Sequence, residues 1–169
     1  MLIRTLTEED AETFRHVRLQ ALRDHPNAFG ASYEDAAAMP IDQLRARMAG
    51  SGTDFILGAF DDRGELAGTA GFRRETSSKM RHKGIVWGMY VGPAYRRKGL
   101  ARMLLTELLE RAARQPGLER INLAVADTNT GALRLYESLG FTAYGKEIDA
   151  MRLDDGTYVN EDLMVKRIR

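Results

Sequence analysis

A run of basic residues stands where a predicted strand gives way to a predicted helix. The segment from Tyr90 to Arg102 reads Tyr-Val-Gly-Pro-Ala-Tyr-Arg-Arg-Lys-Gly-Leu-Ala-Arg. The first amides of a helix lack partners inside the helix, and the helix dipole is positive there, so a helix start is an anion site. Gly99 lets the backbone approach an anion closely, and Ala101 is too small to block it. The chemistry predicted here is the binding of a polyanion.

A solvated basic loop is the simpler interpretation of this cluster taken alone. Its position argues otherwise, because like charges at a helix start oppose the dipole and cost on the order of 0.3–1 kcal/mol each when exposed. A bound polyanion would offset that cost. The segment contains neither the P-loop pattern nor Gly-x-Gly-x-x-Gly, so nucleoside triphosphate and dinucleotide folds have no support.

Two segments carry a resemblance to a known family. The run Arg96-Arg97-Lys98-Gly99-Leu100-Ala101 matches the Gln/Arg-x-x-Gly-x-Gly/Ala signature of the GNAT superfamily of N-acetyltransferases. The segment 129–141 is similar to that family's Asn…Ala…Tyr-Glu…Gly-Phe segment and lies at the usual distance downstream. Together with the order of elements, the resemblance covers nearly the whole chain, and residues before 50 belong to the part that varies with the substrate.

The resemblance implies an enzyme that moves an acetyl group from acetyl-CoA directly to an amine of a small molecule or a protein. It implies that the strands at 84–91 and 120–126 splay apart and that the pantetheine arm lies between them. The residues expected to bind the coenzyme are Met89, Tyr90, Val91, Arg96, Arg97, Lys98, Gly99, Leu100, Ala101, Arg102, Asn129 and Tyr136. Gly88 suits a close approach of another chain, and a simple bulge is the equal alternative.

Tyr136 and Asn129 are seven residues apart and so lie nearly on one face of a helix. In the family, the tyrosine of Leu-Tyr-Glu is the general acid, and Tyr136 would then protonate the leaving thiolate. The alternative for Tyr136 is a core tyrosine with a hydrated hydroxyl group. Asn129 would bind pantetheine, cap its helix, or do both.

A general base is harder to assign. An alkyl amine has a pKa of about 10 and arrives protonated at neutral pH, so a group must accept its proton. Relatives often use a carboxylate on the central strands, but residues 83–91 contain no carboxylate and no histidine. The candidates are Glu34, in the region that shapes acceptor sites, and His82, just before the strand. A chain of waters that ends in bulk solvent is the third route.

The rest of the sequence supplies the elements that position these residues. Strands are predicted at 2–4, 55–60, 65–73, 84–91 and 120–126, with two more around the turn at 154–156. Within 84–91 a regular alternation is predicted, which sets Ile85, Trp87, Met89 and Val91 opposite Val86, Gly88 and Tyr90. Helices are predicted from the N-cap Thr7 to about residue 24, at 32–48 with a break at Pro40, at 99–114 and at 130–139. This order predicts a single α+β domain over residues 1–169, with a central, mostly antiparallel twisted sheet of about seven strands flanked by helices.

The composition excludes several classes of protein. The chain has 169 residues, a net charge of +1 and no cysteine, so disulfides, thiolate metal sites and a cysteinyl acyl-enzyme are excluded. We expect no metal. The balanced charge gives no reason to expect nucleic acid as a partner. No signal peptide and no apolar stretch of membrane-spanning length is apparent, so a cytoplasmic location without membrane contact is expected. Dimers are common in the superfamily, which leaves a homodimer open.

Three other functions compete with the leading hypothesis. One is a different acyl donor or transfer to oxygen, which a fold alone does not exclude. Another is a non-catalytic acyl-CoA-binding module, which the missing carboxylate at 83–91 suggests. The third is nucleic-acid binding through the basic segment 96–102 and the loop at 73–83, against which the balanced net charge argues.

Overall fold

The computed structural model describes residues 1–168, and Arg169, the last residue of the predicted domain, lies outside them. The strands are β1 (Leu2–Thr5), β2 (Phe55–Phe60), β3 (Leu66–Arg74), β4 (Lys83–Val91), β5 (Arg120–Ala126), β6 (Thr142–Arg152) and β7 (Tyr158–Arg167). The helices are α1 (Ala11–Asp24), α2 (Tyr33–Ala38), α3 (Ile41–Met48), α4 (Leu100–Ala113) and α5 (Thr130–Ser138), with the 3-10 turns η1 (Glu8–Asp10) and η2 (Pro93–Tyr95). Every predicted element is present, with bounds within a few residues of the prediction.

Two helix boundaries follow from local chemistry that the sequence displays. Thr7 and Asp10 form a capping box, in which the Thr7 amide donates to Asp10 Oδ2 at 2.7 Å. Pro40 separates α2 from α3 because the residue before a proline is driven out of the helical region, and Met39 has ψ 125°. Helix α1 ends at Asp24 for the same reason, because its C-cap residue His25 directly precedes Pro26.

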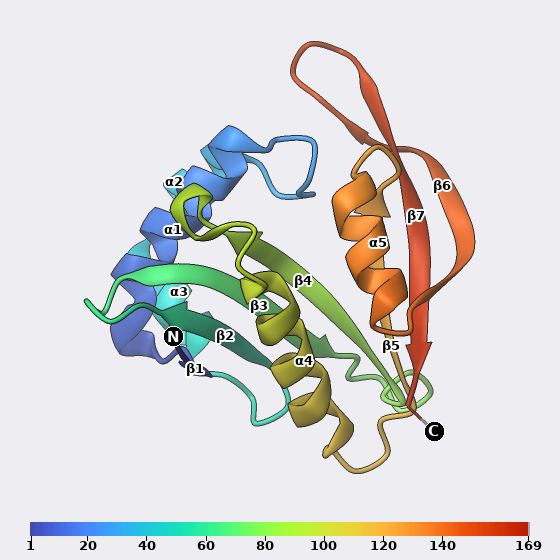
Figure 1. The fold of residues 1–169 in the computed structure, drawn as a ribbon, viewed down its shortest axis with the longest axis horizontal. Coiled ribbons are helices and arrows are strands. Elements are labelled where there is room, and N and C mark those ends of the chain that lie inside the picture. Colours follow the sequence, from blue (N-terminus) through green and yellow to red (C-terminus); the bar gives the residue numbers. More distant parts are fainter. Residues whose placement is uncertain (169) are drawn as a thin grey trace.

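One sheet contains all seven strands, in the order β1-β2-β3-β4-β5-β7-β6 (Figure 1). Every neighbouring pair is antiparallel except β4 and β5, which run parallel. The prediction of a mostly antiparallel sheet is confirmed. The parallel pair arises because the chain crosses between β4 and β5 through α4, as a parallel connection requires.

The strands β4 and β5 separate after a short paired stretch. Only Lys83–Ile85 of β4 pair with β5, at residues 120–122. Beyond that stretch the two strands splay, with β4 continuing beside β3 and β5 beside β7 (Figure 1). Residues 86–91 of β4 therefore have no strand on their β5 side, which confirms the splayed pair.

Two hydrophobic cores lie on opposite faces of the sheet. One forms under α4 and α5 and includes Leu104, Leu108, Ile121 and Phe141. The other forms under α1 and α3 from nine buried residues. Those nine are Leu6, Ala11, Phe14, Val17, Ala21, Met48, Phe60, Leu66 and Tyr90. Figure 1 shows α4 and α5 in front of the sheet and α1–α3 behind it.

A β-bulge interrupts β4 at Gly88, and it corrects the regular alternation predicted for this strand. Thr69 and Gly71 of β3 pair with Tyr90 and Trp87, so β4 contains one extra residue between these pairs. Gly88 has φ +62°, a backbone conformation that glycine adopts without strain. Consequently Trp87 and Tyr90 both face the α1 core, while Met89 and Val91 face the α4 core.

No helix among residues 1–168 is both long enough and apolar enough to pass through a lipid bilayer.

Candidate active site

The basic segment reaches α4 through two residues with left-handed backbone. Gly99 is the N-cap residue of α4 and has φ +77°, and Arg97 has φ +62°. A side chain at Gly99 would meet no atom within 4 Å, so the backbone conformation, rather than crowding, calls for glycine here. Arg97 adopts the same conformation at a steric cost of about 1–2 kcal/mol. Strain of this kind is concentrated at functional sites.

The first amides of α4 open onto the space beside Gly99. The carbonyl of Gly99 accepts the first bond of the helix, from the Met103 amide at 3.1 Å. The amides of the three residues before Met103 have no carbonyl four positions earlier within the helix. Gly99 and Arg97–Lys98 are exposed around them. The predicted anion site at 96–102 therefore has the geometry that anion binding needs.

The basic side chains of this segment point in several directions. Arg96 turns back toward β4, where its Nε donates to the Val91 carbonyl at 3.0 Å and its Nη2 lies 3.0 Å from His25 Nε2. Lys98 donates to the Ala94 carbonyl at 3.3 Å. Arg102 bridges to α5 through Ser138 Oγ at 2.7 Å. Arg97 is exposed and makes no hydrogen bond or ion pair with any described residue, so its charge is available to a ligand.

The end of β4 lies between this anion site and the splay. Met89 and Val91 pack against the α4 core through their side chains, and Tyr90 is buried on the other face. Their backbone faces the side where no strand pairs with β4. Thr69 supports the bulge just before them, because its buried hydroxyl donates to the Gly88 carbonyl at 3.0 Å.

Asn129 and Tyr136 stand on α5, across the splay from β4 (Figure 1). Asn129 caps the helix by accepting a hydrogen bond from the Ala132 amide at 3.3 Å, so the capping role is confirmed. Tyr136 is buried, with its ring 5.9 Å from that of Phe141 in an edge contact. Burial raises the pKa of Tyr136 to about 12. Its hydroxyl makes no hydrogen bond to any described residue.

The two candidate bases lie on separate parts of the fold, and neither stands on β4 or α5. Glu34 is exposed in the first turn of α2, on the far side of the splay from α5 (Figure 1). His82 precedes β4, at the end of the strand opposite to Met89–Val91. At about 3.3 Å per residue, the strand separates His82 from Tyr90 by roughly 25 Å.

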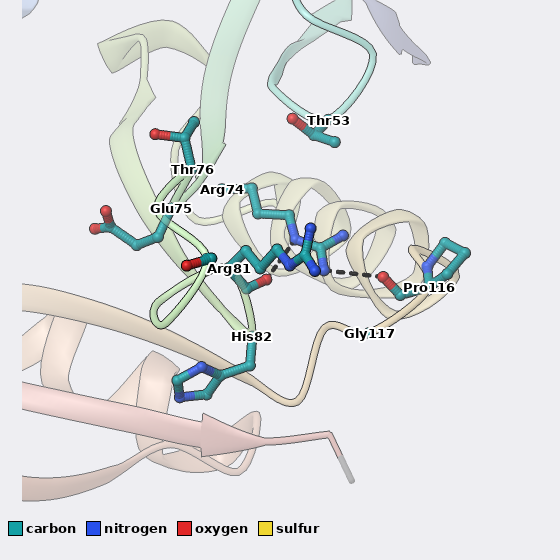
Figure 2. Close-up of a pocket in the computed structure, with 9 residues that line it drawn as sticks. Thr53, Arg74, Glu75, Thr76, Arg81, His82, Pro116 and Gly117 are labelled. Atoms are coloured by element: carbon teal, nitrogen blue, oxygen red, sulfur yellow. Dashed lines mark hydrogen bonds between the residues drawn. The ribbon is translucent and has the colours of Figure 1, made fainter.

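The surroundings of His82 form a separate hollow of about 680 Å³. In Figure 2, Arg74 donates to the carbonyls of Arg81 and Pro116, at 2.6 and 2.9 Å, and the His82 ring points away from it. The carbonyl of His82 accepts from the amides of Glu119 and Arg120, at 2.8 and 3.2 Å, where β4 and β5 meet. These contacts close the narrow end of the splay and assign a structural role to this corner.

Comparison with known proteins identifies the family. The family model for the acetyltransferase (GNAT) family matches residues 7–141, which include the anion site, the splay and α5. The chain belongs to the GNAT acetyltransferase family. This is the family that the two motifs implied.

Curated relatives agree with this membership. The acetyltransferase is 33% identical to a mycothiol acetyltransferase of Segniliparus rotundus over 85% of its own length and 52% of the relative's. A second mycothiol acetyltransferase, from Brachybacterium faecium, is 26% identical over 87% of this chain and 42% of its own. The chain thus spans about half the length of these two relatives. It is also 30% identical to an uncharacterised N-acetyltransferase of Bacillus subtilis, over 80% of this chain and 88% of that protein.

Solved structures share the whole architecture. A GNAT-family acetyltransferase from Streptococcus pneumoniae superposes with a TM-score of 0.87 at 25% identity, covering 98% of each chain. A protein named yncA from Salmonella typhimurium, solved with its cofactor acetyl-CoA, superposes with a TM-score of 0.80 at 22% identity. That comparison covers 100% of this acetyltransferase and 94% of the other chain, and at this identity it shows the fold alone.

Sequence reasoning missed one residue of the acetyltransferase, Arg18. It lines a groove of about 930 Å³ that α1–α3 form over the sheet. Its guanidinium carbon lies over the Phe29 ring, 5.0 Å from the centroid, and over the Trp87 ring at 5.7 Å. Burial lowers its pKa. The available signal was its place in α1, where it follows buried Val17 and lies one turn after buried Phe14.

Proposed function

We propose that this acetyltransferase moves an acetyl group from acetyl-CoA directly to an amine, without a covalent enzyme intermediate. The observation that carries the proposal is the convergence of two features. The free amides at the start of α4 and the unpaired edge of β4 lie beside one another, joined by the segment 92–99. Amides at a helix start bind phosphate, and an open strand edge binds an extended, amide-containing chain. Coenzyme A contains both groups.

The residues present fit the coenzyme. Gly99 leaves open space at the helix start, and exposed Arg97 adds positive charge there. We assign the pyrophosphate to the amides of α4 and to Arg97, and the pantetheine arm to the backbone of Met89–Val91. Asn129 contributes through its side-chain amide nitrogen, since its oxygen already caps α5. When bound, acetyl-CoA supplies the activated acyl group.

Tyr136 is the residue that we assign as general acid. With a pKa of about 12 it stays protonated at neutral pH, and its hydroxyl has no competing partner among the described residues. It gives its proton to the sulfur of the leaving thiolate as the carbon–sulfur bond breaks. A thiolate in the same buried site loses hydration as a phenolate does, so burial raises the pKa of both groups and keeps the proton transfer feasible.

The proton of the attacking amine follows a different route. Glu34 lies in α2, across the splay from α5, and His82 lies before β4, at the end opposite to Met89–Val91, which counts against direct proton abstraction by either. We therefore favour a chain of waters that ends in bulk solvent. On this assignment Glu34→Gln and His82→Gln leave the pH dependence of kcat/KM unchanged, and loss of the acidic limb in either variant would restore that residue as the base.

Calorimetric titration with acetyl-CoA and CoA, beside ATP and NAD as controls, tests coenzyme binding. Selective binding of the two coenzyme forms is expected, and a folded protein that binds neither would refute the proposal. Thiol release with a panel of amines then tests turnover. Tyr136→Phe should lower kcat by about 10²–10⁴-fold, the usual contribution of general acid catalysis, with an unchanged Kd for acetyl-CoA. Binding without thiol release across the panel would indicate a non-catalytic acyl-CoA-binding module instead.

A further inference from the structure

Arg18 is a cation held against the sheet without a counter-charge. Its Nη1 atom is buried and has no hydrogen-bond partner. No carboxylate within residues 1–168 forms an ion pair with it, whereas Arg4, Arg45 and Arg111 all have acidic partners. A buried charge without a partner is costly, so the position of Arg18 calls for an explanation beyond stability.

The aromatic contacts of Arg18 leave the edge of its guanidinium for another group. The guanidinium carbon lies over the rings of Phe29 and Trp87, 5.0 and 5.7 Å from their centroids. Neither contact uses a hydrogen bond from the edge of the guanidinium, and the Nη1 atom on that edge has no partner among the described residues. That edge is the part of arginine that binds a carboxylate with two parallel hydrogen bonds.

Arg18 also lies directly over the bulge of β4. A Cβ atom built on Gly88 would come within 3.6 Å of Arg18 Nη1. The bulge precedes Met89–Val91, the residues to which we assign the pantetheine arm. A ligand group bound to Arg18 therefore lies next to the strand along which the acyl group arrives, on the sheet face opposite to α4.

The groove beside Arg18 favours an anion attached to an apolar body. Its charged lining consists of Arg15, Arg18, Asp35, Arg47, Asp54 and Arg73. Asp54 is already engaged, because its carboxylate accepts from the Arg74 amide at 2.9 Å. Basic side chains thus outnumber acidic ones, and Phe14, Leu19, Leu44 and Ile56 supply apolar surface.

We propose that Arg18 binds a carboxylate of the acceptor, so that the acceptor is a free amino acid or a similar amine that bears a carboxylate. The assignment rests on the proposed acetyl transfer, whose acceptor it specifies. In it, Arg18 selects the acceptor by charge, the groove holds its apolar side chain, and the amine is left facing the bulge and the splay.

Trp87 provides a readout that does not depend on turnover. It is the one tryptophan of the sequence and lies against Arg18, so occupation of the guanidinium should change its fluorescence. The probes are matched sets titrated in the presence of CoA: leucine, leucinamide and isoamylamine, and phenylalanine, phenylalaninamide and phenethylamine. The variants are Arg18→Met, which removes the charge at similar volume, Arg18→Lys, which keeps the charge without the planar pair of donors, and Arg23→Met, which removes an exposed charge of α1 from outside the groove.

At least one amino acid should bind the wild type ten or more times more tightly than its amide. Arg18→Met should abolish that preference, Arg18→Lys should reduce it, and Arg23→Met should preserve it, all with an unchanged Kd for acetyl-CoA. Equal binding of acids and amides by the wild type, absence of binding by either amino acid, or a preference retained in Arg18→Met would overturn the proposal. If Arg18→Met does not fold, Arg18→Lys provides the test. An undiminished preference of Arg18→Lys for the amino acid over its amide would then count against the role of Arg18.

The same probes separate this proposal from the proposed function. Thiol release with the preferred amino acid should follow the same order among the variants, mainly through KM. A carboxylate preference in fluorescence without any thiol release would refute acetyl transfer to these amines and retain the Arg18 site. Acetyl transfer with equal kcat/KM for acids and amides would retain the enzyme and refute the role of Arg18.

Discussion

A negative charge introduced at position 99 is the most direct test of the anion site. Comparing Gly99→Asp with its matched control Gly99→Asn isolates the effect of that charge. Asp and Asn have nearly the same size and both tolerate the left-handed backbone that Gly99 adopts at φ +77°. No atom lies within 4 Å of a Cβ built there. Any steric cost is therefore common to both variants, and the difference between them is one negative charge at the start of α4.

The Asp variant should be more stable than the Asn variant but should bind acetyl-CoA more weakly. A negative charge at a helix start stabilises the free protein by about 0.3–1 kcal/mol, so the Asp variant should melt at the higher temperature. Against a bound pyrophosphate the same charge is repelled. At about 6 Å and an effective dielectric constant of about 40, each phosphate charge costs about 1.4 kcal/mol, and two charges cost about 2.8 kcal/mol, or roughly 100-fold in Kd.

Calorimetry of acetyl-CoA binding at low salt measures the difference, and thermal unfolding of the free variants measures stability. Added salt should narrow the gap in affinity, because exposed charges are screened. Gly99→Glu, which adds a longer acidic side chain, should abolish binding. Equal affinities of the Asp and Asn variants at low salt would refute the assignment of the pyrophosphate to this helix start.

Three further predictions concern the residues around the splay. In the folded protein the pKa of Tyr136 is raised from 10.0 to about 12, so its contribution to the unfolding free energy is complete below pH 10 and falls by about 2–3 kcal/mol as the pH rises through 12. Chemical denaturation should show that Tyr136→Phe lacks this alkaline loss. The same dependence of the unfolding free energy on pH in both proteins would contradict the prediction. Thr69→Val leaves the Gly88 carbonyl without its hydroxyl donor and should cost about 1–3 kcal/mol in unfolding free energy, whereas an unchanged value would mean that the bulge does not depend on this bond. Asn129→Ala should lower the unfolding free energy by about 1 kcal/mol through loss of the α5 cap. Asn129→Asp retains the capping oxygen, so it should retain stability while losing acetyl-CoA affinity if the amide nitrogen binds pantetheine.

Much of the fold was predictable because its signals are local. Pro40 breaks a helix, Thr7 caps one, and the turn at 154–156 joins two strands, whatever surrounds them. The bulge in β4 was not predictable in its consequence. Period-two alternation assumes a regular ladder, and the extra residue at Gly88 moves Tyr90 to the face that Trp87 occupies. Only the pairing with β3, which brings Thr69 opposite Tyr90, fixes that shift.

In the candidate site, too, residues with local signals were predictable and residues brought together by the fold were not. The residues predicted to bind the coenzyme fall into two contiguous segments, so sequence alone grouped them, and the structure brings both to the splay. The proposed acceptor side is assembled from α1, the loop before α2 and β4, and no motif links Arg18 to Phe29 and Trp87. Glu34 and His82 were selected for their chemistry, and the fold places Glu34 across the splay from α5 and His82 at the end of β4 opposite to Met89–Val91. A residue type chosen without its distance to the site is weak evidence for a role.

The splay also has a consequence for solubility. Unpaired strand edges are templates for aggregation, and proteins usually restrict them to the margins of a sheet, where charges or prolines protect them. Here residues 86–91 expose such an edge in the middle of the sheet, and it is built from apolar residues. Protection comes from its position, because α4 and α5 flank it (Figure 1). A β-strand from another molecule carries side chains on both faces, and these would meet the two helices. The flanking helices thus also guard the free protein against self-association at this edge.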